Sequence, residues 1–182
     1  KLGYSYPVIG YSYDSNTTGA HLMKYAKRSL TAGQVIAKKN GRNLGKFIED
    51  FKSYSPTTKI RLIGHSLGTQ VILSTLEYLA KKKNNTGIVE GVYFFGASIT
   101  EDVPSSKKYG KILQNIVNKK IVNHYAPSDE VLGWADKEKF VNGQLEYQFQ
   151  NINRFYWNQK IIDLQVMSLY WKNFRDFISK YA

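Results

Sequence analysis

Residues 60–68 read Ile-Arg-Leu-Ile-Gly-His-Ser-Leu-Gly, a short apolar stretch that leads directly into the pattern Gly-x-Ser-x-Gly. This pattern is typical of a sharp turn between a strand and a helix, on which the serine stands exposed. Small residues two positions before and after the serine let the neighbouring backbone pass close to it. We therefore expect Ser66 to occupy such a turn, with Gly64 and Gly68 providing the clearance.

The residues on both sides of the pattern favour this interpretation over a structural Gly-Ser turn. Lys59–Ile63 has the composition of a strand. After the turn, one apolar stripe with helical spacing is formed by Ile72, Leu76, Leu79 and Ala80. The helix that carries this stripe is expected to run to about Lys83, before a turn at residues 84–87.

Strand-like and helix-like segments alternate along the chain, which predicts a parallel sheet with crossover helices. Strands are expected at Tyr6–Tyr13, Lys59–Ile63, Ile88–Gly96, Lys120–Ala126 and Ile161–Met167. Two later helices are expected at about 108–118 and 170–181. The sequence therefore predicts one α/β domain over residues 1–182, with a mostly parallel sheet of about five strands covered by helices on both faces.

A long helical region precedes the serine motif. One side of it is expected to carry Ile36, Leu44, Phe47, Ile48 and Phe51. Gly41 and Gly45 in the same region would allow another element to pack closely against this helix. Ser55-Pro56 is expected to end it, because the residue before a proline is disfavoured in the helical conformation.

A serine on such a turn needs a general base, and the base needs an acid that orients it. The expected order along the chain is serine, acid and then histidine, each at the C-terminal end of a strand. Asp129 follows the predicted strand 120–126 and is the candidate acid. The alternative is that Ser128 or Asp129 caps the following helix. Glu130, and Asp102 after the preceding strand, are the other candidate acids.

No histidine follows Asp129 in the sequence. His65 adjoins Ser66, but its place on the turn usually points it away from the side where the base stands. His21 lies in the long first crossover and is expected at the surface. His124, near the end of the strand before Asp129, comes closest to the catalytic edge, although a packed position in the strand is favoured for it.

The oxyanion of an acyl transfer would be bound by backbone N–H groups. Leu67, directly after the serine, supplies one of these donors. The second donor usually comes from a loop after an earlier strand. Only five residues precede the predicted strand at Tyr6–Tyr13. The alternatives are that the loop belongs to upstream sequence, that another segment replaces it, or that the site is not catalytic.

The chain carries 26 lysine and arginine residues against 14 acidic ones, a formal net charge of +12. This charge indicates a negatively charged partner, such as an anionic membrane surface, unless it is a solvated basic face. The solvated face is favoured by the position of Lys81–Lys83 at the end of a predicted helix, where cations suit the helix dipole. Nucleic acid is not favoured, because no basic helix is interleaved with aromatic side chains.

The sequence contains no cysteine, and its three histidines do not have the spacing of metal ligands. We therefore expect no disulfide, no metal and no organic cofactor. No apolar stretch is long enough for a transmembrane helix, and the first ten residues do not resemble a signal peptide. The location stays open on these grounds, with the cytoplasm favoured.

An ordered series of segments resembles the α/β-hydrolase superfamily. It resembles, more narrowly, an esterase/lipase-like branch found in archaea and as a domain of some eukaryotic membrane-associated proteins. The matching stretches cover most of residues 6–135 and comprise 8–15, 40–44, 61–68, 95–97, 122–125 and 128–134. The resemblance implies that Ser66 is the nucleophile and Asp129 the acid. The family histidine is expected where this chain reads Ser168-Leu169-Tyr170-Trp171, and the N-terminal strands of the family fold are absent.

The resemblance implies a serine hydrolase that cleaves small-molecule or lipid carboxylic esters through an acyl-enzyme on Ser66. The alternative is a degenerate, inactive member of the fold that acts as a binding or scaffold module. A third hypothesis is a peripheral domain held on an anionic membrane by its basic surface. A missing strand at one edge of the sheet would also favour self-association or pairing with a partner chain.

Overall fold

The structure is a computed structural model, and it describes residues 5–13, 26–100, 102–103, 105, 107–125 and 156–160. The elements, in chain order, are α1 (Ala26–Tyr54), β1 (Arg61–His65), α2 (Gly68–Leu79), the short 3-10 helix η2 (Lys83–Asn85), β2 (Val89–Phe95), α3 (Gly110–Ile116), β3 (Val117–Tyr125) and β4 (Tyr156–Lys160). Strands and helices alternate as predicted, and the protein belongs to the α/β class.

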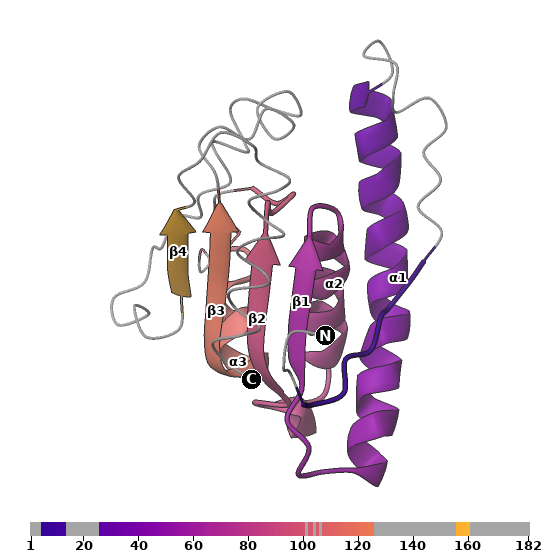
Figure 1. The fold of residues 1–182 in the computed structure, drawn as a ribbon, viewed down its shortest axis with the longest axis vertical. Helices are drawn as coiled ribbons and strands as arrows, with labels where there is room; N and C mark the ends of the chain where they lie inside the picture. The colour runs from indigo at the N-terminus through magenta and orange to yellow at the C-terminus, as the bar shows by residue number, and fades with distance from the viewer. Residues whose placement is uncertain are drawn as a thin grey trace.

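The four described strands form one parallel sheet in the order β1-β2-β3-β4 (Figure 1). Because the strands are parallel, their C-terminal ends meet at one end of the sheet and their N-terminal ends at the other. One row of register partners near the C-terminal ends runs through His65, Phe95, His124 and Gln159. Ser66 comes directly after this row, so it lies at the end where α/β proteins usually bind ligands.

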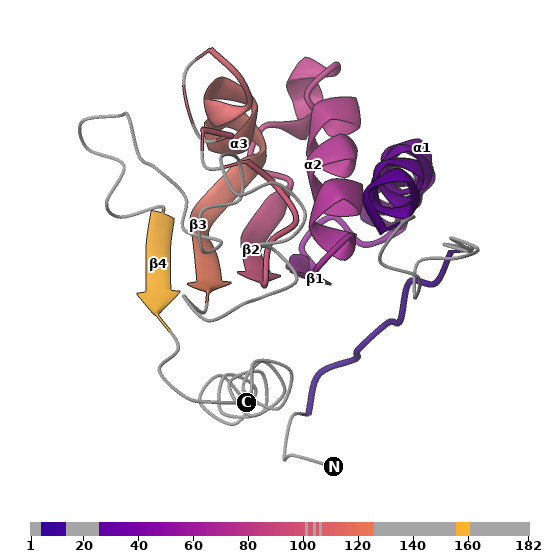
Figure 2. The same ribbon diagram turned by 90° about the horizontal axis from the view of Figure 1, so that it is seen from above.

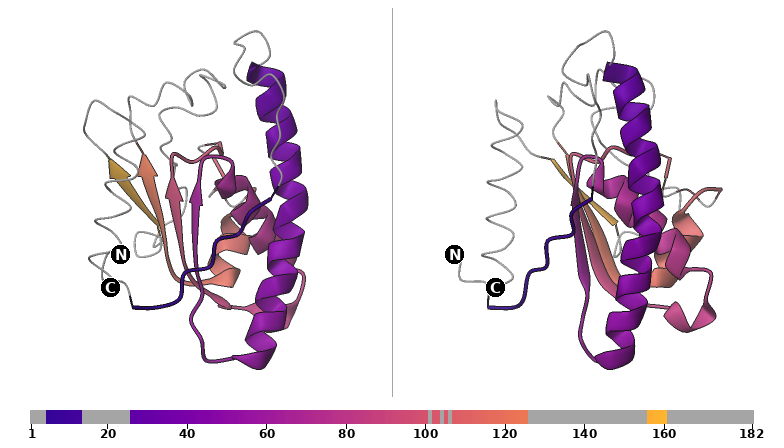
Figure 3. Two further views of the ribbon diagram at one scale, coloured as in Figure 1. Left: turned by 45° about the vertical axis from the view of Figure 1, so that its right-hand side comes forward. Right: turned by 90° about the vertical axis from the view of Figure 1, so that its right-hand side faces the viewer.

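The three described α-helices lie on one face of the sheet (Figure 2). The edge-on view of the sheet in Figure 3 shows the same arrangement. The core between the two layers is apolar and includes Ile48 of α1, Leu76 of α2, Val92 of β2 and Ile121 of β3. Helices were predicted on both faces, but the helix expected at about 170–181 lies outside the described residues.

Two glycines let α1 and α2 approach closely, as the sequence predicted. A Cβ on Gly41 would lie 2.4 Å from the Ser74 Cβ and 2.6 Å from the Val71 carbonyl oxygen. A Cβ on Gly45 would lie 2.4 Å from the Tyr78 ring. The close approach lets the Thr75 hydroxyl donate a 3.0 Å hydrogen bond to the Gly41 carbonyl.

The rest of α1 follows its predicted pattern except at one position. The helix ends at Tyr54, directly before Ser55-Pro56 as expected. Leu44 and Ile48 are buried, whereas Phe47 is 45% exposed. Phe47 therefore does not belong to the side that faces the core, and the predicted stripe was one residue too wide.

The strand predicted at Tyr6–Tyr13 is wrong. Residues 5–13 have an extended path without strand pairing (indigo in Figure 1), and Val8 and Ile9 are 73% and 66% exposed. The segment contacts α1, where the Tyr11 hydroxyl donates a 2.9 Å hydrogen bond to the Asn40 carbonyl. A strand needs a neighbour to pair with, and in the described chain β1 pairs with β2 alone.

The other predicted elements exist with shifted bounds. The helix after the serine ends at Leu79 instead of Lys83, and β3 begins three residues before its predicted start. The sequence predicted no element at β4, while the strand expected at 161–167 lies outside the described residues. No helix in the described part of the chain is long and apolar enough to cross a membrane.

Candidate functional site

Ser66 lies on the turn between β1 and α2, and its backbone is left-handed. Its φ angle is +51°, and among the described residues it is the one non-glycine position with a positive φ. This conformation costs an L-residue on the order of 1 kcal/mol or more, and such strain concentrates at functional sites. The turn predicted for Ser66 is therefore present, with the geometry that raises a serine side chain above the end of a sheet.

Hydrogen bonds from both sides hold Ser66 in this conformation. Its N–H donates a 3.0 Å hydrogen bond to the Phe95 carbonyl at the end of β2. Its own carbonyl accepts two bonds from Thr69, one from the backbone N–H at 3.0 Å and one from the hydroxyl at 2.6 Å. The Ser66 hydroxyl donates to no group and accepts from none among the described residues, so it is available to a ligand.

The two glycines of the motif differ in what surrounds them. A Cβ on Gly64 would lie 2.7 Å from the Ile72 side chain and 3.0 Å from the backbone of Gly68. A Cβ on Gly68 would meet nothing within 4 Å. The prediction that both glycines provide clearance is thus confirmed for Gly64 and wrong for Gly68.

We expect Gly64→Ala to lower the free energy of unfolding by about 1 kcal/mol, because α2 must shift away from β1 to admit the methyl group. The end of the Ile72 side chain can move, which keeps the cost small. Urea denaturation followed by far-ultraviolet circular dichroism measures the change. An unchanged denaturation midpoint would show that the contact between β1 and α2 is loose.

The N-terminus of α2 presents backbone donors beside Ser66. Leu67 is the N-cap residue, and no side chain caps this end of the helix. Within the described chain the Leu67 N–H donates to no acceptor. An uncapped helix N-terminus favours negative charge. This N–H is consequently suited to an oxyanion that forms on a group bound at Ser66.

Thr69 and Gln70 connect the Ser66 turn to the loop that follows β2. The fully buried Thr69 hydroxyl accepts a 3.1 Å hydrogen bond from the Ser98 N–H while it donates to Ser66. The Gln70 amide donates to the Ser98 carbonyl. Neither residue could be predicted from the sequence, because the pattern Gly-x-Ser-x-Gly ends before them and their partner is 28 to 29 residues away.

His124 is a packed residue of β3, as the sequence favoured. It is 6% exposed, and its ring stacks on the Phe95 ring with 4.3 Å between the centroids and 7° between the planes. Burial lowers the pKa of His124 to about 4, so the ring is neutral at pH 7. The register places β2 between His124 and the strand that leads to Ser66, and the structure does not bring the two side chains together.

Asp102, in the loop after β2, is engaged by other groups. Lys108 contacts its carboxylate at 2.6 and 2.7 Å, and the Thr100 hydroxyl donates to it at 2.6 Å. The hydrogen bond from Lys108, followed by that from Thr100, holds the pKa of Asp102 below its usual value. The structure therefore places Asp102 in a local ion pair, and among the described residues no hydrogen bond joins its carboxylate to Ser66.

The remaining predicted site residues, Asp129, Glu130 and His21, lie outside the described residues. No group of three or more histidine, aspartate or glutamate side chains within the described ranges could hold a metal ion. The chemistry that the described site offers is thus that of a serine hydroxyl beside a helix N-terminus.

Comparison with known proteins identifies the chain at the level of a family. A 73-residue stretch is 36% identical to the "Uncharacterized membrane protein F35D11.3" of Caenorhabditis elegans, and it makes up 40% of this chain and 11% of that protein. No solved structure matches. Residues 21–153, more than half of the chain, match the family model described as "Protein of unknown function (DUF726)". The chain belongs to the DUF726 family.

Proposed function

We propose that this protein is a serine hydrolase that cleaves carboxylic esters, with Ser66 as the nucleophile. The left-handed backbone of Ser66, at the turn from β1 into α2, is the observation that carries the proposal. A strained serine at the C-terminal end of a parallel sheet is the arrangement that exposes a hydroxyl for attack on a carbonyl carbon. The nematode relative is described as a membrane protein, which favours lipid esters within this substrate class.

In the proposed reaction the Ser66 oxygen attacks the acyl carbon while a general base takes the hydroxyl proton. The negative charge that develops on the carbonyl oxygen is stabilised by the Leu67 N–H and by the N-terminus of α2. The base then gives the proton to the departing alcohol, and the acyl group stays bound to Ser66. Water hydrolyses this acyl-enzyme and releases the carboxylic acid product. Asp129, the acid implied by the resemblance, would orient the base.

The finer architecture proposed for the chain is that of an α/β hydrolase with a sheet of about five strands. The support is the parallel order β1-β2-β3-β4, the crossover helices α2 and α3, and the place of Ser66 after β1. β2, the next strand after Ser66 and α2, pairs directly with β1. β3 in turn pairs with β2.

A second candidate function is a binding or scaffold module that retains the fold without catalysis. Two observations favour it: no histidine follows Asp129 in the sequence, and His124 is buried against Phe95 instead of standing beside Ser66. A serine without a base is a weak nucleophile at neutral pH. Under this alternative the Ser66 turn would be a relic of an ancestral enzyme.

A fluorophosphonate probe tests the proposal. We expect the wild-type chain to be labelled at Ser66, and Ser66→Ala to lose both the labelling and the hydrolysis of short-chain nitrophenyl esters. Ser53→Ala is the matched control, because Ser53 is an exposed serine at the opposite end of the molecule. Absence of labelling in a wild-type chain with native circular dichroism would reject the enzyme and support the binding module.

A further inference from the structure

The N-terminal ends of the strands bring together basic residues from separate segments of the chain. They come from the end of α1, the start of β1, the connection between α2 and β2, and the first half of β3. We call this cluster the basic end, and it comprises Lys52, Lys59, Arg61, Lys81, Lys82, Lys83, Lys119 and Lys120. It lies at the opposite end of the sheet from Ser66 (Figure 1).

The cations of the basic end form its outer layer. The side chains of Lys59, Lys82 and Lys119 are 71%, 62% and 59% exposed. Two of the four described carboxylates at this end, Glu49 and Glu90, are 15% and 6% exposed and lie beneath the cations. The other two, Asp50 and Glu77, are exposed. The surface therefore carries a local excess of positive charge.

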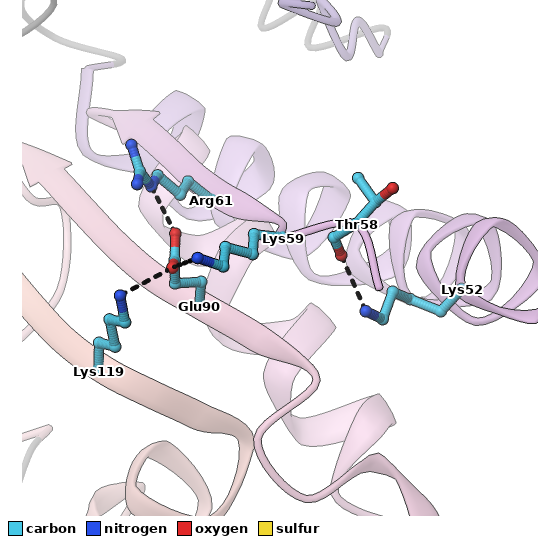
Figure 4. Close-up of polar contacts among 6 residues, drawn as sticks. All are labelled: Lys52, Thr58, Lys59, Arg61, Glu90 and Lys119. Atoms are coloured by element: carbon cyan, nitrogen blue, oxygen red, sulfur yellow. Dashed lines mark hydrogen bonds and ion pairs between the residues drawn. The ribbon is translucent and has the colours of Figure 1, made fainter. Parts of the chain in front are cut away.

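Glu90 shows how the protein assembles several cations at one place. Figure 4 shows Arg61, Lys59 and Lys119 converging on its carboxylate, at 2.7, 3.7 and 3.1 Å. Burial raises the pKa of Glu90, but the hydrogen bonds from Arg61 and Lys119 outweigh this effect and leave the pKa below its usual value. One ionised carboxylate thus holds three cations in position, and a positive excess remains.

An exposed aromatic residue stands beside these cations. Tyr54, the last residue of α1, is 91% exposed. The turn after it is fixed by Lys52, whose ammonium group donates to the carbonyl of Pro56. The ammonium group also donates to the carbonyl of Thr58, as Figure 4 shows. Tyrosine is enriched at membrane–water interfaces, because its ring is apolar and its hydroxyl is polar.

A cavity of about 470 Å³ opens at the same end, between the end of α1 and the connection from α2 to β2. Its lining includes Lys52, Lys82, Asn85 and Thr86, together with the carboxylate of Glu49, to which Lys82 and Asn85 donate hydrogen bonds. The hydrogen-bonding side chains of such a recess suit a polar headgroup.

We propose that the basic end is a docking surface for an anionic membrane. Exposed lysines, with an exposed tyrosine at the end of α1, match the charge and interfacial chemistry of anionic phospholipid headgroups. Nucleic acid fits less well, because single strands need several aromatic side chains for stacking, and among the described residues of this end Tyr54 is the one that is strongly exposed. The proposal does not depend on the chemistry of Ser66.

Sedimentation with phosphatidylcholine vesicles, with and without phosphatidylserine, tests this surface. We expect binding to vesicles that contain phosphatidylserine, and we expect added salt to weaken it. Lys81→Glu combined with Lys83→Glu should weaken binding about 30-fold or more. Each basic residue near such a surface raises the affinity about fivefold, and the variant loses two of them. Both lysines are exposed, and circular dichroism checks that the variant is folded.

Lys38→Glu combined with Lys39→Glu is the matched control. It makes the same change in net charge at exposed positions in the middle of α1, and it should weaken binding less than about threefold. Equal losses in the two variants would reject the basic end as the docking surface. Absence of binding to phosphatidylserine would also reject it, and so would tighter binding to single-stranded RNA that falls in parallel in the Lys81/Lys83 variant.

Discussion

Gly41→Ala is expected to lower the free energy of unfolding by about 2 kcal/mol. An alanine in a helix is normally about 1 kcal/mol better than a glycine, so the expected sign is the reverse of the intrinsic preference. The reason is the contact between α1 and α2, where the new methyl carbon would lie 2.4 Å from the Ser74 Cβ and 2.6 Å from the Val71 carbonyl oxygen. Overpacking typically costs about 1–3 kcal/mol, and contacts with a backbone oxygen and a Cβ place this site at the upper end of that range. Subtracting the gain of about 1 kcal/mol in helix preference leaves a net loss of about 2 kcal/mol.

The matched control is Gly68→Ala, also a helical glycine. Nothing lies within 4 Å of the added methyl group, so we expect this variant to gain about 0.5 kcal/mol. Urea denaturation of both variants beside the wild type gives the two differences. If Gly41→Ala were as stable as Gly68→Ala, the close approach of α1 to α2 would be contradicted.

The second large effect is a loss of stability on acidification that originates at His124. Burial lowers the pKa of His124 to about 4, against an ordinary value of 6.5. Above pH 6.5 the ring is neutral in both states and contributes no pH dependence. As the pH falls from 6.5 towards 4, the unfolded chain binds a proton that the folded chain does not bind. The free energy of unfolding therefore falls, by about 3 kcal/mol in total.

His124→Phe removes this titration and retains a ring that can stack on Phe95. Between pH 6.5 and pH 5, where carboxylates titrate little, the wild type should lose stability more steeply than the variant. Urea denaturation at several pH values measures both slopes. Equal slopes in this window would show that His124 is protonated as readily in the folded state as in the unfolded state.

The sequence predicted the features that depend on local patterns. The turn at Ser66, the end of α1 before Ser55-Pro56, and the close packing at Gly41 and Gly45 were all expected, and the structure confirms them. In each case the cause lies within a few residues: a motif that allows a tight turn, a proline that disfavours a helix, or a missing side chain.

The errors concern features that depend on distant residues. Tyr6–Tyr13 has the composition of a strand, yet composition does not supply the neighbour that a strand needs. Gly68 has the expected place in the motif, but a Cβ there would meet no atom within 4 Å, which depends on how the rest of the chain folds around it. The roles of Thr69 and Gln70 were missed because their partner, Ser98, reaches them through the folding of the sheet.

The basic end is a further feature that depends on residues distant in the sequence. Along the chain, Lys59, Lys81–Lys83 and Lys119 are far apart, and each looks like an ordinary solvated charge. The parallel sheet brings them together, because successive crossovers return the chain to the same end. Net charge could be counted from the sequence, but its concentration at one end of the molecule required the topology.

The parallel pairing of β1 with β2 also has a consequence for the order of events during folding. Paired residues in neighbouring strands are about 30 positions apart in the sequence, and the Ser66 N–H bonds to Phe95 across a similar distance. Contacts between such distant residues form slowly, because a long loop must close first. On the ribosome, the serine turn cannot form its hydrogen bond to Phe95 until β2 has been synthesised, so a motif of five residues matures only after its neighbouring strand.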